Sequence, residues 1–163
     1  MSDDSGSANH SVSANDSEAT YADRASGRVF PNARAMVDAY LERLAERSNT
    51  RLTPLDEHGY TTVRRGSAVV GINVLEDHGV LLILAPVMHV PKVQPERLYR
   101  RLLELSFIAT ADAAFAIDEQ KDEVFVRTLR RLSGLDYEEF EDLVATVAKV
   151  CDEWDDALKK EFG

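Results

Sequence analysis

The sequence predicts an α+β fold in which helices pack on a twisted antiparallel sheet. Three segments carry apolar residues at helical spacing, and five short segments between them are rich in β-branched and apolar residues. Within each group of strands the links are too short to hold a crossover helix, which favours antiparallel pairing. We therefore expect the order α-β-β-β-α-β-β-α within one domain over residues 29–163.

The first 28 residues are expected to form a disordered, polar and mildly acidic tail, because their few apolar residues are isolated. A first helix should follow Pro31 and Asn32, since proline suits the first helical turn. Its apolar residues recur on one face: Ala33, Met36, Val37, Tyr40, Leu41 and Leu44. Asn49 suits the end of this helix.

Three strands should follow, over residues 60–63, 68–74 and 80–85, with turn signals at Gly66 and Gly79 between them. The third of these strands is apolar at every position. We therefore expect it to be central and covered on both faces. Pro86 should limit how far it pairs, because proline has no N–H to donate.

A second helix is expected from Pro95 to about Leu105, and a second hairpin should join strands at residues 113–117 and 123–129. Asp136 with Glu139 forms a capping-box pattern at the start of a third helix. The apolar residues of that helix alternate at spacings of four and three: Phe140, Val144, Val147, Cys151, Trp154 and Leu158. The helix could reach about 39 Å.

The 163 residues carry a formal net charge of −10, which is unevenly placed. Residues 136–163 hold ten acidic and three basic side chains, whereas residues 29–135 are balanced. This acidity argues against nucleic acid as a partner, since phosphate binding needs surplus positive charge. No apolar run approaches the roughly 20 residues of a membrane span, and no secretory signal follows Met1. We therefore expect a cytoplasmic protein with no membrane partner.

No motif of known catalytic, phosphate-binding or dinucleotide-binding chemistry is present. His10, His58, His78 and His89 lack the spacing of metal ligands, and we expect them at surface or turn positions. The single cysteine, Cys151, lies on the apolar face of the third helix and should be an inert buried thiol. We therefore expect no catalytic residue, no cofactor and no metal.

Three stretches resemble the YbjN-like proteins: Ala85-Pro86-Val87 with Val90-Pro91, Leu98–Phe107 with Ala114–Asp118, and Gly134–Phe140. The resemblance covers about residues 30–161. Those proteins share the fold of the type III secretion chaperones of the CesT/Tir chaperone type. The resemblance implies a non-enzymatic, often homodimeric protein that binds an extended segment of a polypeptide client on apolar surface patches.

The favoured hypothesis is thus a chaperone-like or regulatory module that binds a polypeptide client or a regulatory protein. By position in the family, the candidate dimer face is Leu98, Leu102 and Leu105, unless these leucines fill the core of their own protomer. By region of the family fold, which places client contact on the first helix and the first strands, the candidate partner-binding residues are Met36, Tyr40, Val63 and Val69. The alternatives are a small ligand-binding or enzymatic α+β domain and a purely scaffolding role.

Overall fold

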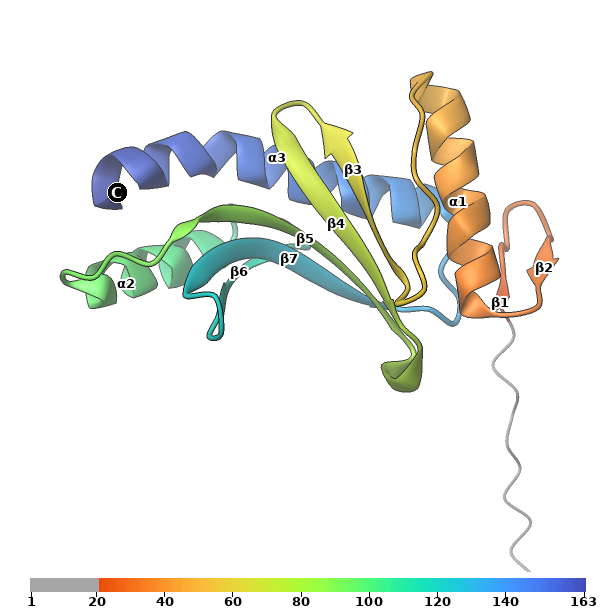
Figure 1. The fold of residues 1–163 in the computed structure, drawn as a ribbon, viewed down its shortest axis with the longest axis horizontal. Helices are drawn as coiled ribbons and strands as arrows, with labels where there is room; N and C mark the ends of the chain where they lie inside the picture. Colours follow the sequence, from red (N-terminus) through yellow and green to blue (C-terminus); the bar gives the residue numbers. More distant parts are fainter. Residues whose placement is uncertain (1–20) are drawn as a thin grey trace, which may run out of the picture.

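The computed structural model describes residues 21–163, so most of the predicted disordered tail lies outside the described residues. Three long helices form one layer over a twisted sheet (Figure 1). They are α1 (Ala33–Ser48), α2 (Pro95–Ser106) and α3 (Tyr137–Phe162). The predicted α+β class is confirmed, and α3 runs 26 residues, close to the predicted length.

Five strands form the main sheet: β3 (Tyr60–Arg65), β4 (Ala68–Leu75), β5 (Val80–His89), β6 (Ala114–Asp118) and β7 (Glu123–Arg131). All neighbouring pairs are antiparallel, in the spatial order β3-β4-β5-β7-β6. A short 3₁₀ turn over Glu76–His78 joins β4 to β5. Both hairpin groups agree with the predicted order, and β5 is the central strand.

A small hairpin before α1 was not expected from the sequence. Strand β1 (Tyr21–Ala22) pairs with β2 (Val29–Phe30), which places residues 21–28 in ordered structure rather than in the predicted tail. Asp23 closes the turn, since its Oδ1 accepts hydrogen bonds from the backbone N–H groups of Ala25 and Ser26. The apolar residues of this segment are isolated in the sequence and form no strand pattern that would predict the hairpin. In the structure they pack against α1.

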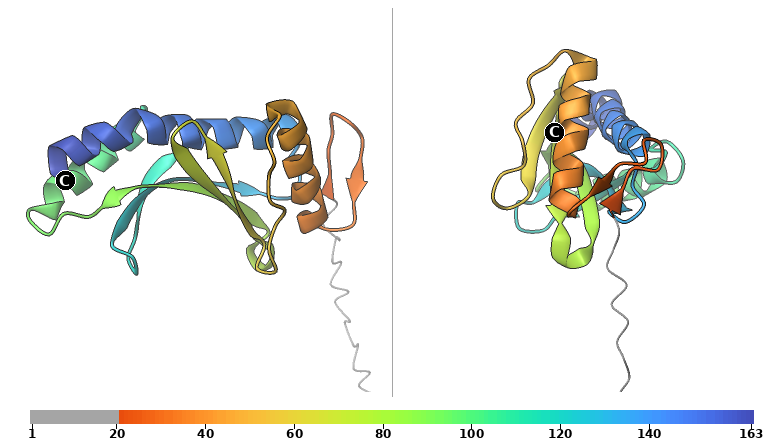
Figure 2. Two further views of the ribbon diagram at one scale, coloured as in Figure 1. Left: turned by 45° about the horizontal axis from the view of Figure 1, so that its top comes forward. Right: turned by 90° about the vertical axis from the view of Figure 1, so that its right-hand side faces the viewer.

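Helix α3 covers the inner face of the sheet by contacting β4, β5 and β7 (Figure 2). The inward side chains of these strands are nearly or fully buried: Val70, Ile72, Leu81, Ile83, Val124 and Val126. Helix α1 packs against the first half of α3, and α2 lies against β6 near the other end of α3. All three long helices therefore lie on the same side of the sheet.

The structure confirms the predicted cap at Asp136 and the predicted helix end at Asn49, and it adds Asn32 as the N-cap of α1. Asn32 accepts a hydrogen bond from the Ala35 N–H at 2.8 Å, and Asp136 accepts one from the Glu139 N–H at 2.9 Å. Asn49 ends α1 in the left-handed conformation with φ of 48°. The Asn32 and Asp136 side chains satisfy N–H groups that the first helical turn leaves unpaired.

The expectation that β5 is covered on both faces is wrong. Its inward residues Leu81 and Ile83 are fully buried, but Leu82 and Leu84 on the other face are only half-buried. Apolar residues at every position show that both faces are apolar, yet they do not show which face a helix covers. The strand also continues through Pro86 to His89, with a register shift between Pro86 and Met88 that accommodates the missing N–H.

Candidate polypeptide-binding surface

The outer face of the sheet is an open apolar surface that none of the described helices covers (Figure 2). It holds a hollow of about 390 Å³ that crosses the middle of the sheet. The lining residues come from four strands and one turn: Tyr60, Val69, Gly71, Asn73, Leu82, Leu84, Pro86, Lys121, Glu123 and Phe125. An uncovered sheet face of this kind is a place where another chain can bury apolar side chains.

Gly71 shapes the floor of this hollow. A Cβ at this position would lie 2.9 Å from the Tyr60 hydroxyl oxygen and 3.2 Å from Leu84 Cδ2. The missing side chain therefore lets the Tyr60 ring lie across β4 beside Leu84. A larger residue at this position would force the Tyr60 and Leu84 side chains to move.

Asn73 places one polar atom in the hollow. By register it lies between Tyr60 on β3 and Leu82 on β5. Its Oδ1 is buried and has no hydrogen-bond partner within the described part of the chain. A buried acceptor without a donor is costly, so this oxygen destabilises the folded protomer.

Of the four candidate partner-binding residues, only Val69 lies on this surface, where it is 38% exposed. Met36, Tyr40 and Val63 are buried in the core. The first two point from α1 toward the other helices and strands, and Val63 alternates to the inner side of β3. These three side chains are therefore not available for direct contact with a partner on the folded protomer.

The three candidate dimer residues, Leu98, Leu102 and Leu105, are also buried, with at most 5% of each exposed. They fill the core of their own protomer, which is the alternative that the helical spacing left open. The opposite side of α2 and the segment after it expose apolar side chains instead. Leu103 is 75% exposed and Phe107 is 89% exposed, and Tyr99 and Ile108 are also exposed.

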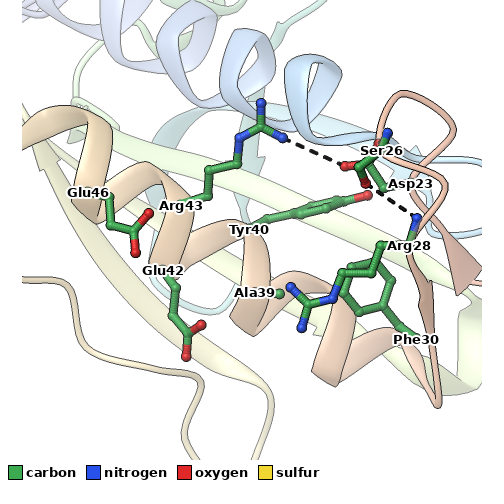
Figure 3. A pocket seen from close by; sticks show the side chains of 9 residues that line it. All are labelled: Asp23, Ser26, Arg28, Phe30, Ala39, Tyr40, Glu42, Arg43 and Glu46. Carbon is green, nitrogen blue, oxygen red and sulfur yellow. Dashed lines mark hydrogen bonds and ion pairs between the residues drawn. The ribbon is translucent and has the colours of Figure 1, made fainter.

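A second hollow, of about 280 Å³, lies between the β1–β2 hairpin and α1 (Figure 3). Arg43 reaches from α1 to the buried Asp23 carboxylate, with 3.9 Å between the charged atoms. The Arg28 guanidinium lies 4.8 Å from the centre of the Phe30 ring. Arg43 and Arg28 already contact Asp23 and Phe30, respectively. We therefore interpret this hollow as the place where the hairpin packs on α1.

The side chains that could perform catalysis are poorly placed for it. Burial raises the pKa of the Cys151 thiol to about 11, and the nearby Asp155 carboxylate adds to the rise. The thiol is therefore not a nucleophile near neutral pH. His58 and His78 line an open hollow at the β4–β5 turn, where the His58 side chain is 81% exposed. Residues 21–163 hold no group of three His, Cys, Asp or Glu side chains that could bind a metal.

The sequence could have indicated the outer surface through one signal, which is the apolar character of β5 on both faces. Leu82, Leu84, Phe125 and Leu129 were not among the candidate residues. Their outward position depends on strand register, which the alternation within β7 left open until the structure assigned Val124 and Val126 to the core. Among residues 21–163 no helix has the length and apolar character needed to cross a membrane.

Solved structures with the same fold include three complexes. The ExsC–ExsE complex matches with a TM-score of 0.61 at 23% identity, over 75% of this chain and 92% of that chain. The HopA1–SchA chaperone–effector complex matches with a TM-score of 0.61 at 12% identity, over 76% and 96%. The ExoU–SpcU complex from the type III secretion system of Pseudomonas aeruginosa matches with a TM-score of 0.55 at 17% identity, over 72% and 93%.

A search of curated protein sequences finds no significant match. The family model of the Tir chaperone proteins (CesT) matches residues 39–155, which is more than half of the chain. This match confirms the predicted non-enzymatic, chaperone-like module that binds a polypeptide partner. The finer YbjN-like resemblance is compatible with the match and stays a prediction. The uncovered apolar sheet, the shared fold and the family match agree, and the chain belongs to the Tir chaperone protein (CesT) family.

Proposed function

We propose that this protein is a cytoplasmic chaperone for a client of a type III secretion system, and that it holds an extended client segment on the outer face of its sheet. The observation that carries the proposal is the uncovered outer side of β5, where Leu82 and Leu84 are only half-buried. Structures with the same fold include a chaperone–effector complex and a type III secretion complex, which supports this class of client.

The chemistry of the surface suits an extended segment. Each client side chain that covers Val69, Leu84 or Leu129 removes apolar area from water at about 25 cal/mol per Å². The open hollow gives room for client side chains. A segment held in this way stays extended and cannot fold into a compact domain. Export requires this extended state.

The exposed side of α2 supports a second part of the proposal, namely a homodimer. Leu103 on α2 and Phe107 and Ile108 directly after it are each at least 75% exposed, whereas the leucines Leu98, Leu102 and Leu105 of α2 are buried. A second copy of the chain would cover them with the same residues, as a two-fold interface requires. The client surface and the dimer surface are then separate.

Affinity purification of the full chain from its native bacterium, followed by mass spectrometry, tests the client proposal. We expect one protein in stoichiometric amount with the wild type and its loss with Leu84→Asp, which places a charge on the outer face. Ala145→Asp is the matched control, because it adds the same charge at an exposed position of α3. The proposal fails if both variants retain the same partner or if the wild type retains none.

A further inference from the structure

The outer face of the sheet carries positive charge although the chain as a whole is acidic. Register places Arg64 of β3 and Arg127 and Arg131 of β7 on this face, together with the apolar residues of the hollow. Lys121 at the rim of the hollow lies 3.9 Å from Asp118, and these two charges offset each other. Glu123 is the carboxylate that lines the hollow.

Arg127 occupies the central position among these cations. By register it lies between Leu84 of β5 and Ala114 of β6, and it follows Phe125 along the same face of β7. The side chain is half-buried. Glu123 stands four residues away along the strand, which is about 13 Å in an extended chain. The immediate neighbours of Arg127 on this face are therefore apolar.

Four arginines among residues 21–163 have carboxylate partners, namely Arg43, Arg47, Arg100 and Arg130. Arg130 pairs with Glu139 of α3. It lies three residues after Arg127 on β7 and faces the inner side of the sheet. Arg47 of α1 lies 3.4 Å from Glu141. Arg127 makes no ion pair and no side-chain hydrogen bond with the described part of the chain. Its guanidinium is the central charge of the outer face and lacks a partner there.

A polypeptide that covers Leu84 also covers Arg127, since the two residues are register partners. Covering removes water from a half-buried guanidinium, and a charge without water or a partner is costly. A carboxylate on the incoming chain would offset this cost through charge-assisted hydrogen bonds, which arginine makes in a two-pronged geometry. An amide offsets less of the cost, and an ammonium group adds repulsion.

We propose that the outer face selects an extended client segment that combines aliphatic side chains with a carboxylate placed against Arg127. This inference rests on the proposed function, because it names the chemistry of the client at the same surface. Arg127 is then the residue that determines specificity, and the leucines around it supply contact area. The occupant is a partner polypeptide and not a second copy of this chain.

The test uses three fluorescein-labelled peptides of alternating leucine and serine, flanked by glycine and serine, that differ only in a central glutamate, glutamine or lysine. Fluorescence anisotropy measures their binding to the full chain. We expect the glutamate peptide to bind about fivefold more tightly than the glutamine peptide, and the lysine peptide to bind weakest. The preference should shrink as salt rises from about 0.05 M to about 0.5 M.

Arg127→Glu should reverse the order of the three peptides, whereas Arg97→Glu, the same charge change on α2, should preserve it. Thermal unfolding checks that Arg127→Glu is folded, and Arg127→Gln, which should remove the preference, is the second variant. Leu84→Asp should weaken the binding of all three peptides. If the three peptides bind with equal affinity and Leu84→Asp weakens their binding, the inference is overturned and the proposed function still stands.

Two other results are decisive. If the peptides do not bind, or bind equally well to Leu84→Asp, the outer face is not the client surface, and the inference falls with that part of the proposed function. If light scattering shows that Arg127→Glu changes the oligomeric state, a second copy of the chain occupies the face, and the inference is overturned.

Discussion

Tyr40 shows how one residue can join two distant parts of the chain. Its hydroxyl donates a hydrogen bond to the Leu135 carbonyl oxygen at 2.9 Å, which links α1 to the start of the C-terminal helical segment. The ring lies edge-on to Phe30 and Tyr137, with centroids 5.9 Å and 5.8 Å away. Burial, and then the Asp23 carboxylate, raise the pKa of this phenol far above its ordinary value. The hydroxyl is therefore a permanent donor in the folded protein.

Tyr40→Phe should lower the free energy of unfolding by about 1 kcal/mol, because the buried Leu135 carbonyl loses its donor. Urea denaturation followed by circular dichroism measures the change. Tyr99→Phe is the control, since Tyr99 is partly exposed on α2 and its hydroxyl can bond to water. Equal stability of the two variants would show that the buried hydrogen bond contributes nothing measurable.

The Cys151 thiol gives the protein a predicted pH dependence at the alkaline end. It lies 3.4 Å from the Pro86 carbonyl oxygen, and burial raises its pKa from 9.0 to about 11. The unfolded chain therefore loses the thiol proton at lower pH than the folded chain does. This contribution to stability is fully present below about pH 9 and decreases as pH rises toward about 11.

The matched comparison is Cys151→Ala, which keeps every other titrating group. The wild type should lose about 1 kcal/mol of unfolding free energy relative to this variant between about pH 8 and about pH 10. Urea denaturation at each pH measures the difference. If the two proteins lose stability in parallel over this range, the thiol has an ordinary pKa in the folded state.

Helix α2 has one buried and one exposed apolar side. Leu98 and Leu102 fill the core, whereas Leu103 is 75% exposed. The spacing of apolar residues predicts this helix, but it does not show which of the two apolar sides is buried in the protomer. Burial in the protomer assigns one side to the core, and the exposed side is the one that we propose for the homodimer.

Leu103→Asp should convert the proposed homodimer to a monomer, because a charge at the centre of an apolar interface must lose its water. Multi-angle light scattering measures the mass, with Ala145→Asp of α3 as the control for added charge. Leu103→Asp should leave the unfolding transition of the protomer nearly unchanged, since the side chain contacts solvent. A wild type that is monomeric at every concentration would contradict the dimer proposal.

On the scale of the whole molecule, one continuous core joins all three helices to the sheet. Val37 of α1, Leu98 of α2 and Val147 of α3 belong to the same cluster of buried residues as the inner strands. Removing any layer would expose the others to water. We therefore propose that residues 29–163 unfold as a single domain together with the hairpin before them.

Trp154 gives a local probe of this cooperativity, because it is the single tryptophan of the chain. The centre of its ring lies 5.7 Å from the Arg101 guanidinium carbon, where α2 meets α3. Urea unfolding followed by Trp154 fluorescence should coincide with unfolding followed by far-ultraviolet circular dichroism. Two transitions at different urea concentrations would show that the α2 end of the molecule is a separate unit.

Much of the fold could be predicted because it depends on local signals. The cap Asp136, the helix end at Asn49 and the turn signals at Gly66 and Gly79 mark where elements begin and end. The candidate partner-binding residues came from their position in the chain, and three of them, Met36, Tyr40 and Val63, lie in the core. An apolar residue on a helix or strand has the same pattern whether it packs inward or awaits a partner.

The amino-acid sequence by itself determined the class of fold, the order of its elements and the absence of catalytic motifs, because periodicity, capping and motif spacing act over a few residues. The tertiary structure alone decided that the three helices share one side of the sheet, so that Leu82 and Leu84 of β5 remain open. It also decided that Arg127 lies among them without a carboxylate partner. These outcomes depend on contacts between residues far apart in the chain, and those contacts leave no periodic pattern.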